Sequence, residues 1–198
     1  MNILYTIENS IYVNITNTCP CSCVFCIRNE KDEVANSGSL WLEHEPSVDE
    51  VKEAFNKYNL DDYDEIVFCG YGEPLMRINE LIDVAKFIKE KSSIKIRINT
   101  NGLSDLIHNK KTAILLKDVI DAVSISLNAP NKEAYNRVTQ PKFGEKSFDY
   151  MLDFAKDCKK YIKEVAFSVV DEISPEEIEE SKQLAKKLDI PLRVRHKN

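Results

Sequence analysis

Four cysteines within eight residues most strongly constrain what this 198-residue chain can be. They are Cys19, Cys21, Cys23 and Cys26. A disulfide framework spreads its cysteines to join distant segments, so this crowding instead indicates a metal site. Soft thiolate ligands suit an iron–sulfur cluster or zinc. The two isolated cysteines, Cys69 and Cys158, are expected to be small buried hydrophobic side chains.

The spacing of three of these cysteines favours a cluster with an open coordination position. Cys19, Cys23 and Cys26 are separated by three and then two residues, which is tight enough to wrap around one inorganic cluster. Three thiolates on a four-iron cluster leave one iron without a protein ligand, and an open position can bind a substrate. Cys21 is interpreted as a spare thiol, because a fourth thiolate would block that iron. A four-thiolate zinc site is the alternative, although structural zinc usually draws two ligand pairs from separate segments.

Length and composition predict a single domain over residues 1–198. The net charge of −6 argues against a dedicated nucleic-acid binder, whose binding face is usually basic. No apolar run approaches the roughly 18 residues of a membrane span. The N-terminus also lacks the basic and small-residue pattern of a secretory signal. We therefore expect a cytoplasmic protein with reduced thiols.

Strand-like and helix-like segments alternate along the chain after a short opening hairpin. The expected strands are rich in Val, Ile, Phe and Tyr and cover residues 11–16, 65–70, 94–99, 122–127, 165–170 and 192–196. The expected helices cover residues 47–58, 78–91, 104–117, 146–161 and 175–188. Six strands separated by helices imply right-handed crossovers and a parallel sheet.

Polar residues within the strands favour a curved barrel over a flat sheet with helices on both faces. Buried parallel strands are usually near-continuous apolar runs, but Ile96 and Ile98 alternate with Arg97 and Asn99. The polar face of such a sheet must be exposed to solvent or must bind a polar ligand. The predicted fold is therefore α/β, a partial (βα)6 barrel with parallel strands, preceded by a short N-terminal hairpin. An antiparallel sheet with one solvated face is the alternative, which the intervening helices suit poorly.

Polar segments follow the ends of four successive predicted strands. The cysteine segment comes first, and segments that contain Glu73, Asn101 and Asn128 follow. In barrel folds the reactive groups gather at the C-terminal ends of the strands. The four segments are therefore expected to form one site.

The chain resembles the radical S-adenosylmethionine (radical SAM) superfamily. Its cysteine loop is similar to the pattern Cys-x3-Cys-x-aromatic-Cys, with Phe25 at the aromatic position. Gly70-Tyr-Gly-Glu-Pro74 resembles the GGEP segment, except that Tyr71 replaces the first of the paired glycines. Asn99-Thr-Asn-Gly102 and Ser126-Leu-Asn-Ala129 resemble the TNG and SLDA-like segments, with Asn128 in place of the acid. More narrowly, residues 41–46, 68–74, 124–130, 141–145 and 191–196 resemble the short TatD-associated radical SAM proteins.

The resemblance implies an enzyme that cleaves S-adenosylmethionine (SAM) reductively at one [4Fe–4S] cluster bound by Cys19, Cys23 and Cys26. The 5′-deoxyadenosyl radical then abstracts a hydrogen from the substrate, while the protein supplies orientation and excludes water. The implied SAM contacts are Gly72 and Glu73 for the methionine part, Asn101, Ser126 and Asn128 for methionine or ribose, and Val169 and Val170 beside adenine.

Partners and substrate are less constrained, and the catalytic residues are not identified. The family implies a reducing partner of the flavodoxin or ferredoxin kind. If Arg97, Arg193 and Arg195 face inward, their guanidinium groups would bind a carboxylate or phosphate, so an anionic substrate group is a hypothesis. The alternatives are arginines that are solvated, salt-bridged or bound to the SAM carboxylate.

Two other functions remain open. An open-sided barrel would admit a protein substrate, as a glycyl-radical-enzyme activase requires. The other possibility is a binding module stabilised by zinc or a cluster, without turnover.

Overall fold

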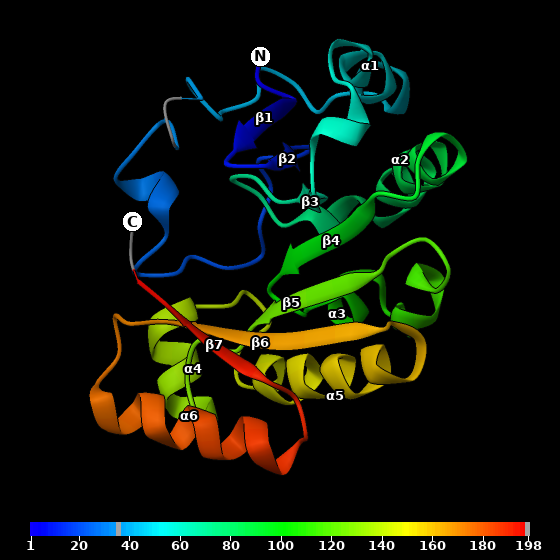
Figure 1. The fold of residues 1–198 in the computed structure, drawn as a ribbon. Helices are drawn as coiled ribbons and strands as arrows, with labels where there is room; N and C mark the ends of the chain where they lie inside the picture. Colours follow the sequence, from blue (N-terminus) through cyan, green and yellow to red (C-terminus); the bar gives the residue numbers. More distant parts are fainter. Residues whose placement is uncertain (35–36, 197–198) are drawn as a thin grey trace.

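The computed structural model describes residues 1–34 and 37–196, which form one seven-stranded sheet (Figure 1). The strands are β1 (Leu4–Ile7), β2 (Ser10–Val13), β3 (Glu65–Phe68), β4 (Lys95–Thr100), β5 (Ala122–Ser126), β6 (Glu164–Val170) and β7 (Leu192–Arg195). They are adjacent in chain order; β1 and β2 pair antiparallel, and all other neighbours pair parallel. The predicted α/β fold, with six parallel strands after an N-terminal hairpin, is confirmed. Because β1 and β7 are not paired with each other, the sheet is open at the side.

Helices connect the parallel strands and flank the sheet (Figure 1). They are α1 (Val48–Ala54), α2 (Ile78–Lys91), α3 (Ser104–His108), α4 (Lys132–Thr139), α5 (Lys146–Tyr161) and α6 (Pro175–Lys187). Short 3-10 turns occupy Ile27–Asn29, Phe55–Lys57, Leu60–Asp62, Pro74–Arg77 and Ala113–Leu116. The N-caps of the first and last helices are Ser47 and Ser174, each of which forms a reciprocal capping box with a glutamate. No helix in the described part of the chain is long and apolar enough to cross a bilayer.

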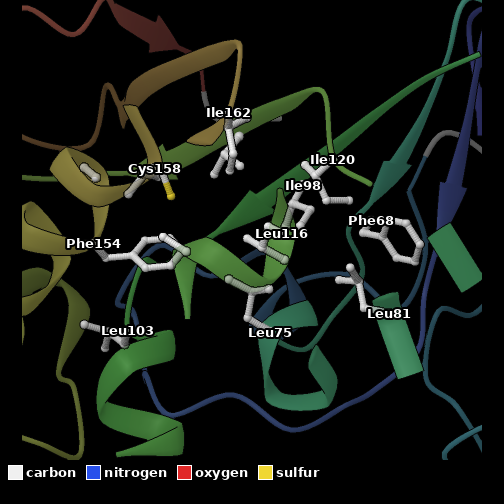
Figure 2. Packing of buried hydrophobic residues seen from close by; sticks show 14 of the residues in the cluster. Phe68, Leu75, Leu81, Ile98, Leu103, Leu116, Ile120, Phe154, Cys158 and Ile162 are labelled. Atoms are coloured by element: carbon white, nitrogen blue, oxygen red, sulfur yellow. The ribbon is translucent and has the colours of Figure 1, made fainter. Parts of the chain in front are cut away.

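Alternate residues of the strands build the main core on the side of the helices. Ile96 and Ile98 of β4 and Ile125 of β5 are fully buried, whereas Arg97 and Asn99 are on the opposite face. Figure 2 shows part of this core, including Phe68, Leu75, Leu81, Ile98, Leu103, Leu116, Ile120, Phe154, Cys158 and Ile162. Burial of each such large side chain stabilises the fold by roughly 1.5–3 kcal/mol. The core therefore leaves the polar strand residues on the other face.

The helical region predicted over residues 104–117 is broken into two pieces. Helix α3 ends at His108, because Asn109 takes a left-handed conformation with φ of 51°. The buried Asp105 carboxylate then accepts hydrogen bonds from the backbone N–H and the hydroxyl of Thr112, both at 2.8 Å. This side chain stabilises the loop at the expense of a continuous helix.

Helix α4 is absent from the sequence prediction. It begins at Asn131, whose side chain accepts a hydrogen bond from the Ala134 N–H at 2.9 Å. The Asn131 cap is the signal that could have identified the helix. As shown below, its C-terminal end contacts the cysteine loop.

Candidate functional site

The cysteine loop and the ends of the parallel strands enclose a cavity of about 330 Å³. Its walls include Cys19, Cys21, Cys23, Phe25, Cys26, Cys69, Gly70, Tyr71, Asn99, Asn101, Ser126, Asn128, Val170, Arg195 and His196. The structure therefore brings together the three predicted cluster ligands and four of the predicted SAM contacts, which are Asn101, Ser126, Asn128 and Val170. The cavity is at the C-terminal ends of the parallel strands, where barrel folds carry their reactive groups.

The cysteine loop is attached to the segment at the end of α4. The Ser22 N–H donates to the Thr139 carbonyl at 3.1 Å, and the Val24 N–H donates to the Val138 carbonyl at 2.9 Å. These bonds fix the backbone between the cysteines. The sequence gives no indication of this contact, because the partners are more than 110 residues apart.

Cys21 is close to two of the predicted cluster ligands. Its side chain is 4% exposed and hydrogen-bonds to the thiols of Cys19 and Cys23. These hydrogen bonds lower the pKa of Cys19 to about 6, lower the pKa of Cys23 and raise the pKa of Cys21 itself. Burial raises the pKa of Cys26. The lowered pKa values shift Cys19 and Cys23 toward the thiolate, which is the form that binds metal.

Arg28 contacts the cysteine loop, and the sequence analysis did not single it out. Its guanidinium donates long hydrogen bonds to the carbonyls of Asn17 at 3.3 Å, Cys21 at 3.4 Å and Tyr71 at 3.4 Å. The positive charge also contributes to lowering the pKa of Cys19. Its position two residues after the last cysteine was the available signal. Arg28 connects the cysteine loop to two neighbouring strand ends and offsets thiolate charge.

Glu73 is buried and does not line the cavity. Its carboxylate accepts hydrogen bonds from the Thr100 hydroxyl at 2.7 Å, the Asn101 N–H at 2.7 Å and the Leu75 N–H at 3.0 Å. Burial raises the pKa of this carboxyl to about 7, and Cys19 acts in the same direction, while the hydrogen bonds oppose the shift. Glu73 thus joins the segments after β3 and β4 and positions Asn101.

Gly72 is likewise not among the residues that line the cavity. A Cβ atom there would lie 2.3 Å from the Thr16 carbonyl oxygen and 2.7 Å from that of Thr18. Glycine is therefore required for close backbone packing. Tyr71 does line the cavity, and its ring packs edge-on against Trp41 with 5.1 Å between centroids. The residue that departs from the family glycine pair thus contributes a side chain to the wall.

Asn101 and Asn128 supply amides to the cavity wall. The Asn101 Nδ2 atom lies 3.8 Å from the Sγ atoms of both Cys19 and Cys21. Asn128 has a left-handed backbone with φ of 60°, and its buried Oδ1 atom has no hydrogen-bond partner. A hydrogen-bond donor on a bound ligand would satisfy that oxygen.

Two predictions about individual side chains are corrected by the structure. Val169 is fully buried in the main core with Phe167, on the face of β6 opposite Val170, so it is removed as a residue beside adenine. Cys158 is buried in the core as predicted, but Cys69 lines the cavity.

The three candidate anion-binding arginines have different surroundings. Arg97 binds Glu65 through two hydrogen bonds, Nε to Oε2 at 3.1 Å and Nη2 to Oε1 at 2.6 Å. The guanidinium group of Arg97 is therefore already paired with a carboxylate of the same chain. Arg195 lines the cysteine cavity, and Arg193 lines a second cavity of about 570 Å³.

The donor set at the cavity fits an iron–sulfur cluster and a polar ligand. Within residues 1–34 and 37–196, no group of three or more His, Cys, Asp or Glu side chains is arranged to hold a metal ion. Cys19, Cys23 and Cys26 instead line one cavity with the unsatisfied Asn128 oxygen. Soft thiolates beside polar amides suit a cluster next to a polar cofactor. These three cysteines would hold the cluster, and the neighbouring wall would hold SAM.

Comparison with known families matches residues 13–185 to the radical SAM superfamily. The chain is 26% identical over 147 residues to a probable dual-specificity RNA methyltransferase RlmN of Fervidobacterium nodosum, a match covering 73% of this chain and 40% of that protein. It is 30% identical over 137 residues to a probable GTP 3′,8-cyclase of Methanocaldococcus jannaschii, covering 69% of this chain and 41% of that protein. The chain thus spans about two-fifths of the length of these curated relatives.

Solved structures show the same fold at low sequence identity. SuiB of Streptococcus suis, bound to its precursor peptide SuiA, has a TM-score of 0.69 and 16% identity, covering 98% of this chain and 40% of that one. A radical SAM methyltransferase from Sphaerobacter thermophilus has a TM-score of 0.63 and 16% identity, covering 98% and 68%. These likenesses identify the open sheet as the predicted partial barrel.

Proposed function

Because the chain belongs to the radical SAM superfamily, we propose that it cleaves SAM reductively at a [4Fe–4S] cluster held by Cys19, Cys23 and Cys26. The bound cluster and SAM supply the radical chemistry that removes a hydrogen atom from the substrate. One observation carries the proposal, which is that the three cysteines share a single cavity with residues at the ends of β3 to β7.

The chain's own residues prepare this cavity for ligand binding. The pKa values of Cys19 and Cys23 are lowered toward the metal-binding thiolate form, and the Asn101 amide lies near the sulfur of Cys19. Ser126 and Asn128 offer polar contacts to SAM, while Val170 offers an apolar one. We assign Glu73 and Gly72 an indirect role, because they hold the cavity wall in place.

The test is anaerobic reconstitution with iron and sulfide, followed by reduction in the presence of SAM and assay of 5′-deoxyadenosine. The Cys19→Ala, Cys23→Ala and Cys26→Ala variants should each lose the four-iron centre and reduce product formation at least a hundredfold, because each removes a ligand. Cys21→Ala should retain iron and sulfide, which tests its assignment as a non-ligand. Cys158→Ala is the matched control, because that thiol is buried in the core away from the cavity.

Metal analysis of the same preparations separates the alternatives. About one zinc per chain without labile sulfide would contradict the proposal and support a binding module. A four-iron centre that needs Cys21 as well as the other three would also contradict it, because no iron would remain open to SAM. Hydrogen abstraction from a glycine of a partner protein would identify an activase.

A reductant of the flavodoxin or ferredoxin kind and a cytoplasmic location belong to this proposal. The cluster must receive an electron, and its thiolates must stay reduced until the metal binds. Membership of the TatD-associated group stays a prediction based on the quoted segments.

A further inference from the structure

Two cavities are stacked along the inner face of the sheet. On β4, Arg97 lines the 570 Å³ cavity and Asn99 lines the cysteine cavity. On β5, the neighbouring strand, Ser124 lines the 570 Å³ cavity and Ser126 lines the cysteine cavity. Residues two apart on a strand point to the same face. The second cavity therefore continues the cysteine cavity toward the N-terminal ends of the strands.

On β7 the corresponding inward pair is Arg193 and Arg195. Register places Arg193 beside Ser168 and Arg195 beside Val170, on the inner face of β6. Arg193 lines the 570 Å³ cavity and Arg195 lines the cysteine cavity. One strand thus carries a guanidinium group into each cavity.

Neither of these two arginines forms an ion pair with an acid in the described lining of the two cavities. Three other arginines do pair with an acid: Arg97 pairs with Glu65 at 2.6 Å, Arg77 pairs with Glu80 at 3.3 Å, and Arg137 pairs with Glu177. Among the described residues that line the two cavities, no carboxylate forms an ion pair with Arg193 or Arg195. This is notable in a chain whose net charge is −6.

The acids near these arginines are either absent or already paired. The described lining of the cysteine cavity contains no aspartate or glutamate. The three acids of the second cavity each bind another cation: Glu65 binds Arg97, Glu164 binds Lys95 and Asp189 binds Lys159. The two guanidinium groups are therefore available to an anion that enters from solvent.

We propose that Arg193 and Arg195 together bind a doubly anionic group of the substrate, a diphosphate or a pair of linked carboxylates. Their backbone positions are about 6.6 Å apart along the strand, a span that two linked anionic groups can bridge. Guanidinium groups bind such oxygens through paired hydrogen bonds. The rest of the substrate then extends into the cysteine cavity. This inference rests on the proposed function, because it names the substrate class of that site.

Pyrophosphate is the probe that tests this site. Its binding is measured by calorimetry on the oxidised holoprotein with SAM at saturation, so that SAM already occupies the open iron. Arg193→Gln and Arg195→Gln should each weaken binding about tenfold or more, the loss expected for a charge-assisted hydrogen bond. Arg137→Gln is the matched control, since Arg137 binds Glu177 outside both cavities. The affinity of the Arg137→Gln variant for pyrophosphate should stay within twofold of the wild-type affinity.

Any of these results would overturn the inference: no pyrophosphate binding by the wild type, unchanged affinity in both variants, or equal weakening in Arg137→Gln. Binding that disappears when SAM is added would also overturn it, because Arg195 would then serve the SAM carboxylate. Circular dichroism verifies that the variants are folded. Failure of the proposed function is distinguishable, because a wild type that forms no 5′-deoxyadenosine can still be tested for pyrophosphate binding without SAM.

Discussion

The buried carboxyl group of Glu73 makes the free energy of unfolding depend on pH. Its pKa is raised from the ordinary value near 4.5 to about 7, chiefly by burial. The folded state therefore holds this proton more tightly than the unfolded state. The resulting stabilisation is fully present below about pH 4.5 and is lost as the pH rises through about 7. For a fully buried group, this change is on the order of 3 kcal/mol.

Replacing Glu73 by glutamine should remove this pH dependence. The NH2 group of glutamine cannot accept hydrogen bonds from the donors around this site, whereas both oxygens of the protonated wild-type carboxyl can, so Glu73→Gln should lower the free energy of unfolding at pH 5 by about 1–3 kcal/mol. Urea denaturation of the metal-free proteins between pH 4.5 and 8 should show the gap to the wild type narrowing as the pH rises. Glu53→Gln is the control, because Glu53 is exposed. Parallel pH profiles for Glu73→Gln and the wild type would refute the assignment.

The individual elements were predictable wherever local signals agreed. The Ser47 and Ser174 caps and the apolar alternation of β4 are local, so the corresponding elements appear where expected. The break after α3 depends on Asp105 binding Thr112, and that contact competes with helix formation in a way that periodicity does not reveal. Helix α4 was missed because it has only eight residues, so its apolar pattern repeats over no more than about two turns.

The contact between α4 and the cysteine loop can be tested through a backbone donor. Val24→Pro removes the N–H that donates to the Val138 carbonyl, whereas the side chain of Val24 is 56% exposed. The variant should retain less iron and sulfide, and a chelator should strip its cluster several times faster, because the loop is less ordered. Val24→Ala keeps the donor and should match the wild type. Equal cluster loss in both variants would mean that the side chain, and not the hydrogen bond, matters.

Across the whole molecule, strand order made the site predictable in outline. Groups at the ends of successive parallel strands converge in any such sheet, and Cys19, Asn101 and Asn128 do so here. Sequence could not reveal that Arg97 pairs with Glu65, because that pairing depends on the register of β3 and β4. The role of Arg28 also depends on carbonyls from separate strand ends. Side-chain pairings that depend on tertiary contacts therefore could not be predicted from the sequence.

The two apolar clusters of the molecule should unfold together. A smaller cluster of Tyr5, Leu40 and Tyr71 lies apart from the main core, and Trp41, the single tryptophan, packs on Tyr71. Because the same strands carry residues of both clusters, we expect the urea transitions by Trp41 fluorescence and far-UV circular dichroism to coincide. A fluorescence transition at clearly lower urea would show that the smaller cluster unfolds independently.

Alternate residues along β4 and β5 serve two separate purposes, which are packing of the core and contact with a ligand. Ile98 and Ile125 maintain the core, while their immediate neighbours Asn99 and Ser126 face the cavity. A substitution at an inward position changes what the cavity accepts and leaves the packing under the helices intact. Single substitutions at inward positions can consequently change the substrate preference of this fold while each successive variant keeps nearly the same free energy of unfolding.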